Sequence, residues 1–156
     1  MPVHRSAGAI IFRETKKGKS LRQAQGKEFL LLHYPSITAR GTQGGHWDFS
    51  KGHIEKREKT EDAVKREVKE ETGISDLEII PGFKETIRYF VNYGGKKSLK
   101  FVAFFLAQTN QEKVILSWEH QGYVWLPYEE AYKKITYTNA KQMLNRAHDF
   151  LLEKDV

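Results

Sequence analysis

The stretch that decides the fold runs from Gly52 to Ile74 and reads GHIEKREKTEDAVKREVKEETGI. Its second half predicts a helix over residues Thr60 to Thr72. Thr60 is a candidate N-cap, and the two acidic residues after it stand where the helix dipole favours negative charge. Gly73 follows as a C-terminal stop, because glycine readily adopts the left-handed conformation that ends helices. Gly52 is expected to form a sharp turn from strand to loop.

Three glutamates of this helix share one face. At about 100° per residue, Glu67, Glu70 and Glu71 fall within a single arc, because residues three and four apart are neighbours. Like charges at this spacing cost roughly a few tenths of a kcal/mol per pair. A hard divalent cation with oxygen ligands would offset that repulsion. On these residues alone, a solvated surface helix remains the alternative.

A longer pattern surrounds the three glutamates: Gly, five residues, Glu, seven residues, Arg-Glu, an aliphatic residue, any residue, Glu-Glu, any residue, Gly and an aliphatic residue. In this pattern the chain resembles the Nudix hydrolases, which cut phosphoanhydride bonds of nucleoside polyphosphates with Mg²⁺, and for which Mn²⁺ is an alternative ion. The resemblance implies that Glu67, Glu70 and Glu71 bind the metal. It also implies that Arg66 pairs with the preceding loop acid, Glu58. The matching positions are Gly52, Glu58, Arg66, Glu67, Val68, Glu70, Glu71, Gly73 and Ile74.

Segments outside this pattern are similar, within that family, to the asymmetrically cleaving diadenosine tetraphosphate hydrolases. They are His46-Trp47, Lys51-Gly52-His53, Gly82-Phe83-Lys84 and SWEHQGYVW at Ser117 to Trp125. This resemblance implies cleavage of diadenosine tetraphosphate to ATP and AMP. It assigns His46, Lys51 and Lys100 to the polyphosphate, Tyr89 and Tyr137 to the two faces of adenine, and Glu119 to the metals as a further ligand or base. The proton acceptor stays open between Glu58, Glu71 and Glu119.

The chain departs from the family pattern at two places. Ser50 stands where a proline usually precedes Lys51, and Lys56-Arg57 replace a Pro-Gly turn before Glu58. Both changes are expected to loosen the loop before the helix.

The remaining sequence predicts an α+β fold, with a mixed sheet flanked by helices in an α/β/α sandwich and one domain over residues 1–156. Alternation and β-branched or aromatic runs predict the strands, and Gly94-Gly95 predicts a hairpin turn. Pro127 indicates a short helix, and apolar spacing predicts a final one. The expected strands are 6–13, 29–33, 77–80, 84–93, 99–107 and 122–126, the helices 128–134 and 138–152, and the loops 14–27 and 34–45.

Composition narrows the function classes. The chain has 156 residues, no cysteine and a net charge of +6. The absence of cysteine excludes disulfides and thiolate chemistry, and no apolar run has transmembrane length. We therefore expect a cytoplasmic monomer with a nucleotide substrate and no membrane partner. The positive charge keeps open an RNA 5′ end as partner and an RNA 5′-pyrophosphohydrolase as the alternative enzyme. A nucleotide-sensing module without catalysis is the alternative outside the enzymes.

Overall fold

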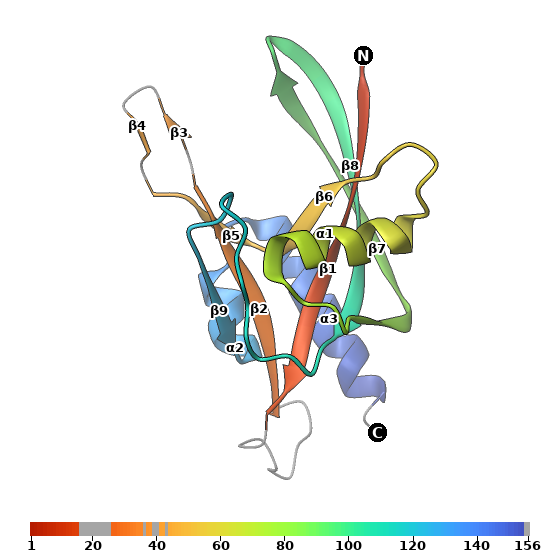
Figure 1. Cartoon of the computed structure of the whole chain (residues 1–156), viewed down its shortest axis with the longest axis vertical. Coiled ribbons are helices and arrows are strands. Elements are labelled where there is room, and N and C mark those ends of the chain that lie inside the picture. Colours follow the sequence, from red (N-terminus) through yellow and green to blue (C-terminus); the bar gives the residue numbers. More distant parts are fainter. Residues whose placement is uncertain (16–25, 36, 39–40, 43, 155–156) are drawn as a thin grey trace.

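The computed structural model describes residues 1–15, 26–35, 37–38, 41–42 and 44–154 (Figure 1). Strands and helices alternate in chain order much as the sequence predicts. The elements are β1 Val3–Glu14, β2 Lys27–Tyr34, β3 Ile37–Thr38, β4 Gly41–Thr42, β5 His46–Asp48, β6 Ser50–His53, α1 Thr60–Thr72, β7 Glu78–Tyr93, β8 Lys96–Gln108, β9 Gly122–Leu126, α2 Tyr128–Lys134 and α3 Thr138–Lys154.

A mixed sheet in the order β5-β2-β1-β8-β7 forms the middle layer, with β6 paired to β1 and β9 to β2. β1 and β8 run parallel, and the other pairings are antiparallel. Helix α1 covers one face, while α2 and α3 lie on the other (Figure 1). β1 supplies both cores, since Ala9 and Ile11 pack with α1 and Ile10 and Phe12 with α3. This arrangement confirms the predicted sandwich.

The segment 46–53 is wedged between β1 and β2. These two strands pair directly only near Phe12 and Phe29. Farther along, β5 pairs with β2 and β6 pairs with β1. The short segment 46–53 therefore fills the space between β1 and β2 where these strands separate. The wedge brings residues of β5 and β6 beside α1 on one face and beside the α3 layer on the other.

Several sequence predictions need correction. The expected strands 77–80 and 84–93 are one strand, β7, with an irregular register between Ile79 and Lys84. The expected loop 34–45 contains the β3–β4 pair, and β5 follows it at once. Thr60 is not the N-cap, because it is already the first helical residue and Lys59 occupies the capping position without a side-chain hydrogen bond.

Other local predictions are confirmed. Gly73 ends α1 with a φ of 74°, and Gly94 and Gly95 form the two-residue turn between β7 and β8 with φ of 56° and 79°. The predicted hairpin connection at 14–27 lies mostly outside the described residues, although its ends are joined by the Thr15 N–H to Gly26 carbonyl bond of 2.7 Å. Among the described residues, no helix is both long and apolar enough to cross a membrane.

Candidate active site

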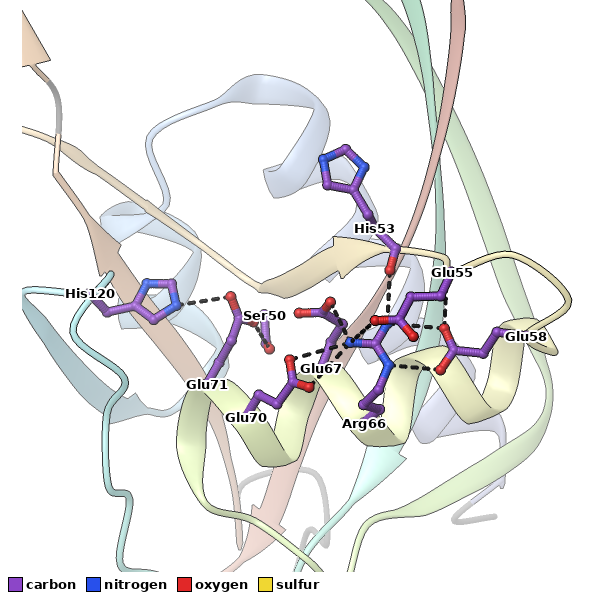
Figure 2. A network of polar contacts seen from close by, with 9 residues as sticks. All are labelled: Ser50, His53, Glu55, Glu58, Arg66, Glu67, Glu70, Glu71 and His120. Atoms are coloured by element: carbon purple, nitrogen blue, oxygen red, sulfur yellow. Dashed lines mark hydrogen bonds and ion pairs between the residues drawn. The ribbon is translucent and has the colours of Figure 1, made fainter.

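The loop before α1 is held by Arg66. Its Nε and Nη2 donate to the two oxygens of Glu58 at 2.7 and 3.0 Å, which confirms the predicted pairing. A fork of two parallel bonds fixes both groups. The Arg66 contact, with a further bond from the Glu55 N–H, lowers the pKa of Glu58 from 4.5 to about 2. The carboxylate is therefore ionised at neutral pH and pinned in place (Figure 2).

The departure at Lys56-Arg57 keeps a defined turn. The Glu58 N–H donates to the Glu55 carbonyl at 3.0 Å, and Arg57 has a φ of 67°. A positive φ at the third position of a turn favours glycine, with proline before it. Arginine thus adopts the family's turn at some conformational cost, and the expected loosening of the loop stays a prediction.

Glu67 lies against the backbone of β6. A Cβ on Gly52 would stand 2.0 Å from the Glu67 Cδ, so the carboxyl group fits only because residue 52 has no side chain. Gly52 is therefore needed for this close approach inside β6, and not for the sharp turn that we expected. Burial raises the pKa of Glu67, and the charges of Glu71 and Glu70 add to the rise while Arg66 opposes it.

Arg66 also contacts the exposed end of the acidic face. Its Nη1 donates to Glu67 at 2.9 Å and to both oxygens of Glu70 at 3.3 Å. Glu70 is the exposed member of the set, with 58% of its side chain accessible. One guanidinium thus bridges the loop acid and two of the predicted metal ligands.

Glu71 is held by two residues from other parts of the chain. Ser50 Oγ donates to Oε1 at 2.5 Å, and His120 Nε2 lies 3.0 Å from Oε2 (Figure 2). All three residues are buried. Ser50 is the second departure from the family pattern. Its hydroxyl joins β6 to α1, and the expectation that it loosens this region stays a prediction.

The predicted metal ligands provide a donor set of the right chemistry. Glu67, Glu70 and Glu71 offer hard carboxylate oxygens on one side of α1, and burial, with the charges of Glu71 and Glu70, raises the pKa of Glu67. In the arrangement that the described residues adopt, no three His, Asp or Glu side chains form a group that could hold a metal ion by itself. Carboxylate oxygens are nevertheless the ligands that Mg²⁺ prefers, and Mg²⁺ takes few of them and keeps several waters. The chemistry of the three side chains therefore suits a hard divalent cation.

The predicted role of Glu119 as a further metal ligand or base stays a prediction. Glu119 lies exposed in the turn before β9, and its neighbour His120 makes the contact with Glu71. The charge of Glu119 is close enough to Tyr34 to be one cause, after burial and the charges of Glu71 and Asp48, of the raised pKa of that phenol. The structure thus does not group Glu119 with the three glutamates of α1 among the described contacts.

A cavity of about 660 Å³ opens on the other side of β6. It brings together four of the five predicted substrate-binding residues, namely His46, Lys51, Tyr89 and Tyr137. The fifth, Lys100, is outside the lining. It stands opposite Tyr89 in the β7–β8 register and close enough to His53 to contribute to that residue's lowered pKa, whose main cause is burial.

The polar and aromatic walls of the cavity are built by different elements. Lys51 Nζ lies 3.2 Å from Asp48 Oδ2. Burial alone would lower the pKa of Lys51, but Asp48 and Tyr89 together outweigh it and the pKa is raised, so the lysine stays charged. His46 stacks on Tyr34 at 4.9 Å between ring centroids, and Tyr137 lies tilted to it at 5.2 Å. The cavity therefore combines a held cation with aromatic rings.

Sequence reasoning missed some of these contacts. Asp48 stands between two aromatic residues and three residues before Lys51, and this spacing was the available signal. Ser50 gave no signal beyond its departure from the pattern. Tyr34, which stacks on His46 and packs edge-on against His120, lies in a segment expected to be loop.

Comparisons with known proteins agree with this geometry. The model of the NUDIX domain family matches residues 2–147. The asymmetrical bis(5′-nucleosyl)-tetraphosphatase of Mus musculus is 36% identical over 151 residues, which cover 94% of this chain and 95% of the relative. An RNA pyrophosphohydrolase of Sulfurovum sp. is 32% identical over 124 residues, which cover 73% of this chain and 75% of the relative. A crystal structure of a Caenorhabditis elegans Ap4A hydrolase binary complex is similar, with a TM-score of 0.73 and 33% identity over 95% of this chain and 97% of the other.

Proposed function

Because the chain belongs to the Nudix family of hydrolases, we propose that its substrate is diadenosine tetraphosphate, cleaved asymmetrically to ATP and AMP. One observation carries this proposal. The wedge of β5 and β6 presents Lys51 to an aromatic cavity on one side and lies against the carboxylates of α1 on the other. A base and a polyphosphate chain need such neighbouring sites.

The cavity would hold one adenosine. Tyr89 and Tyr137 come from distant segments and line the same space, so they can stack on the two faces of one base. Such stacking contributes on the order of 1–3 kcal/mol per base. Lys51 and His46, in the same lining, stand where the phosphates attached to that adenosine would begin. Lys100 would act farther along the polyphosphate.

The carboxylates of α1 would hold Mg²⁺, with Glu67, Glu70 and Glu71 as its ligands on this chain. A bound divalent cation supplies charge neutralisation at the phosphates and lowers the pKa of water. Phosphoryl transfer otherwise depends on positioning. Arg66 and Gly52 contribute that positioning here, because they determine where the Glu67 carboxylate lies.

Glu58 is poorly suited to accept the proton from the attacking water. Its pairing with Arg66 lowers its pKa to about 2, which makes it a weak base at neutral pH. Glu71 and Glu119 remain the candidates for this role.

The test is hydrolysis of diadenosine tetraphosphate with Mg²⁺ in water labelled with heavy oxygen, followed by separation and mass analysis of the products. ATP and AMP are the expected products, with the label in one of them only. The labelled product identifies the phosphorus that is attacked. Two molecules of ADP would overturn the asymmetric assignment and leave the Nudix family membership intact.

RNA with a 5′-triphosphate is the second candidate substrate. The Sulfurovum relative is named as an RNA pyrophosphohydrolase, and the net charge of +6 suits a polyanion. Comparing kcat/KM for diadenosine tetraphosphate and for a short triphosphorylated RNA decides between them, and the first should be higher. Turnover of either substrate would exclude a purely sensing role.

A further inference from the structure

Glu71 differs from the other glutamates of its face because the protein occupies both of its oxygens from distant segments. Ser50 Oγ is 2.5 Å from Oε1, and His120 Nε2 is 3.0 Å from Oε2. Ser50, Glu71 and His120 are 2%, 5% and 7% exposed. Glu70, in contrast, accepts hydrogen bonds from Arg66, and its side chain is largely solvated. The orientation of Glu71 is therefore determined by the fold.

Both contacts leave Glu71 able to serve a cation. An ionised carboxylate only accepts hydrogen bonds, so Ser50 Oγ–H and His120 Nε2–H are the donors. A carboxylate has about four lone-pair sites, and the two donors use one on each oxygen. A lone pair on each oxygen stays available.

The donors are themselves held in place. The ring of Tyr34 packs edge-on against His120 at 4.6 Å, and its hydroxyl donates to the Phe49 carbonyl at 2.6 Å. Ser50 lies in the wedge, opposite Ala9 of β1. Because each donor is fixed by packing or by strand pairing, it can fix the carboxylate in turn.

Ser50 is a feature of this chain, since the family pattern has a proline there, which carries no hydroxyl. Resting on the proposed function, we infer that Ser50 and His120 are positioning residues that orient Glu71 for divalent-cation binding. Loss of a hydrogen bond that orients a metal ligand typically weakens metal affinity by about 10- to 100-fold. Ser50 and His120 act through Glu71 and touch neither the substrate nor the reacting atoms.

The experiment measures Mn²⁺ binding to the full chain by titration calorimetry without nucleotide, so that it does not depend on turnover. Ser50→Ala should raise the Kd for Mn²⁺ about tenfold, and Ser50→Thr, which keeps the hydroxyl, should restore binding. His120→Ala and His120→Gln form a second pair, because glutamine keeps an N–H donor. Thermal unfolding of each variant separates loss of the contact from loss of the fold.

A matched control is Ser6→Ala. Ser6 is also 2% exposed, and its hydroxyl has no hydrogen-bond partner among the described residues. Removing it deletes a buried serine hydroxyl without touching Glu71. This variant should bind Mn²⁺ as the parent protein does.

A double-mutant cycle with Glu71→Gln completes the test. If Ser50 acts through Glu71, Ser50→Ala should change the Kd by less than about twofold once Glu71 is glutamine. An equal loss in both backgrounds, or a silent Ser50→Ala beside a damaging Glu71→Gln, would overturn the inference and leave the proposed function standing. Parent-like Mn²⁺ binding by Glu71→Gln itself would overturn both the inference and the assignment of Glu71 as a ligand.

Discussion

On the α1 side of β6, Glu58, Glu67 and Glu71 each have a protein donor within hydrogen-bonding distance. These donors come from α1, from β6 and from the loops before α1 and before β9. On the cavity side, Tyr137 is half exposed and Tyr89 lines open space. The same four-residue strand borders both regions. The carboxylates on the α1 side, here called the acidic side, are held in place before any ligand binds. The cavity side instead offers open ring faces on which a base can stack.

This difference separates two tasks. Carboxylates that must hold the cation beside a phosphate chain gain from being fixed in advance, because no reorganisation is then needed. A stacking site needs only flat surfaces at the right spacing and tolerates different bases. We therefore expect changes on the acidic side to affect kcat and changes in the cavity to affect KM. The following predictions test that division.

The largest effect is expected for Glu70→Gln. Glutamine keeps the shape and loses the charge, so kcat should fall by about a hundredfold or more, equivalent to about 2.7 kcal/mol of barrier. Glu70 is exposed, so the melting temperature should barely change. Glu61→Gln, on the first turn of the same helix, is the control and should keep its activity. A folded Glu70→Gln variant with parental kcat would remove this residue from the metal site.

The next effect concerns the cavity. Tyr89→Ala and Tyr137→Ala should each raise KM for diadenosine tetraphosphate about tenfold, from the loss of one stacking contact. Hydrolysis of a polyphosphate ester without a base should change little. Tyr132→Ala removes an exposed tyrosine of α2 outside the cavity lining and should be silent. Equal losses on both substrates would show that Tyr89 and Tyr137 only pack.

A pH-dependent effect follows from Glu58. Its pKa is lowered from 4.5 to about 2 in the folded protein, so its stabilisation is present above 4.5 and is lost as the pH falls through about 2. The melting temperature of the parent should exceed that of Glu58→Gln at neutral pH, and the gap should close across this window. A gap that stays constant into acid would mean that the ionised pair does not stabilise the fold.

The smallest effect is expected at the turn before α1. Arg57→Gly relieves a positive φ, which destabilises a residue with a side chain by about 1–2 kcal/mol. Glycine's extra freedom in the unfolded chain opposes this gain by about 0.5–1 kcal/mol. A net gain of about 0.5–1 kcal/mol, equivalent to roughly 1–4 °C, should appear in thermal unfolding. Lys56→Gly, at the neighbouring position, should destabilise instead. Stabilisation by both would point to charge rather than to backbone conformation.

The local part of the structure was predictable from sequence. The spacing of Glu67, Glu70 and Glu71 places them on one helical face, and the seven residues between Glu58 and Arg66 allow their pairing without any other element. The sandwich followed from the order of periodic segments, and the resemblance supplied four residues that do line one cavity.

The long-range part was not predictable. Ser50 and His120 reach Glu71 across 21 and 49 residues of sequence, and neither helical nor strand periodicity connects such positions. β5 and β6 have three and four residues, too few to show alternation. Lys100 and Glu119 were assigned by resemblance alone, and the described contacts place them at the edges of the site.

The register in which β6 pairs with β1 also determines toward which side of the strand each functional group points. Ser50 and Gly52 point toward α1, and Lys51 points toward the cavity. A slip of one position along β1 would exchange these directions, because strand side chains alternate. In the slip that moves Lys51 into the position of Gly52, the lysine would be driven into the space that the Glu67 carboxylate occupies, and Ser50 would replace it beside the cavity. A single inserted amino acid in this strand would thus erase both halves of the site at once, even though it altered none of their residues.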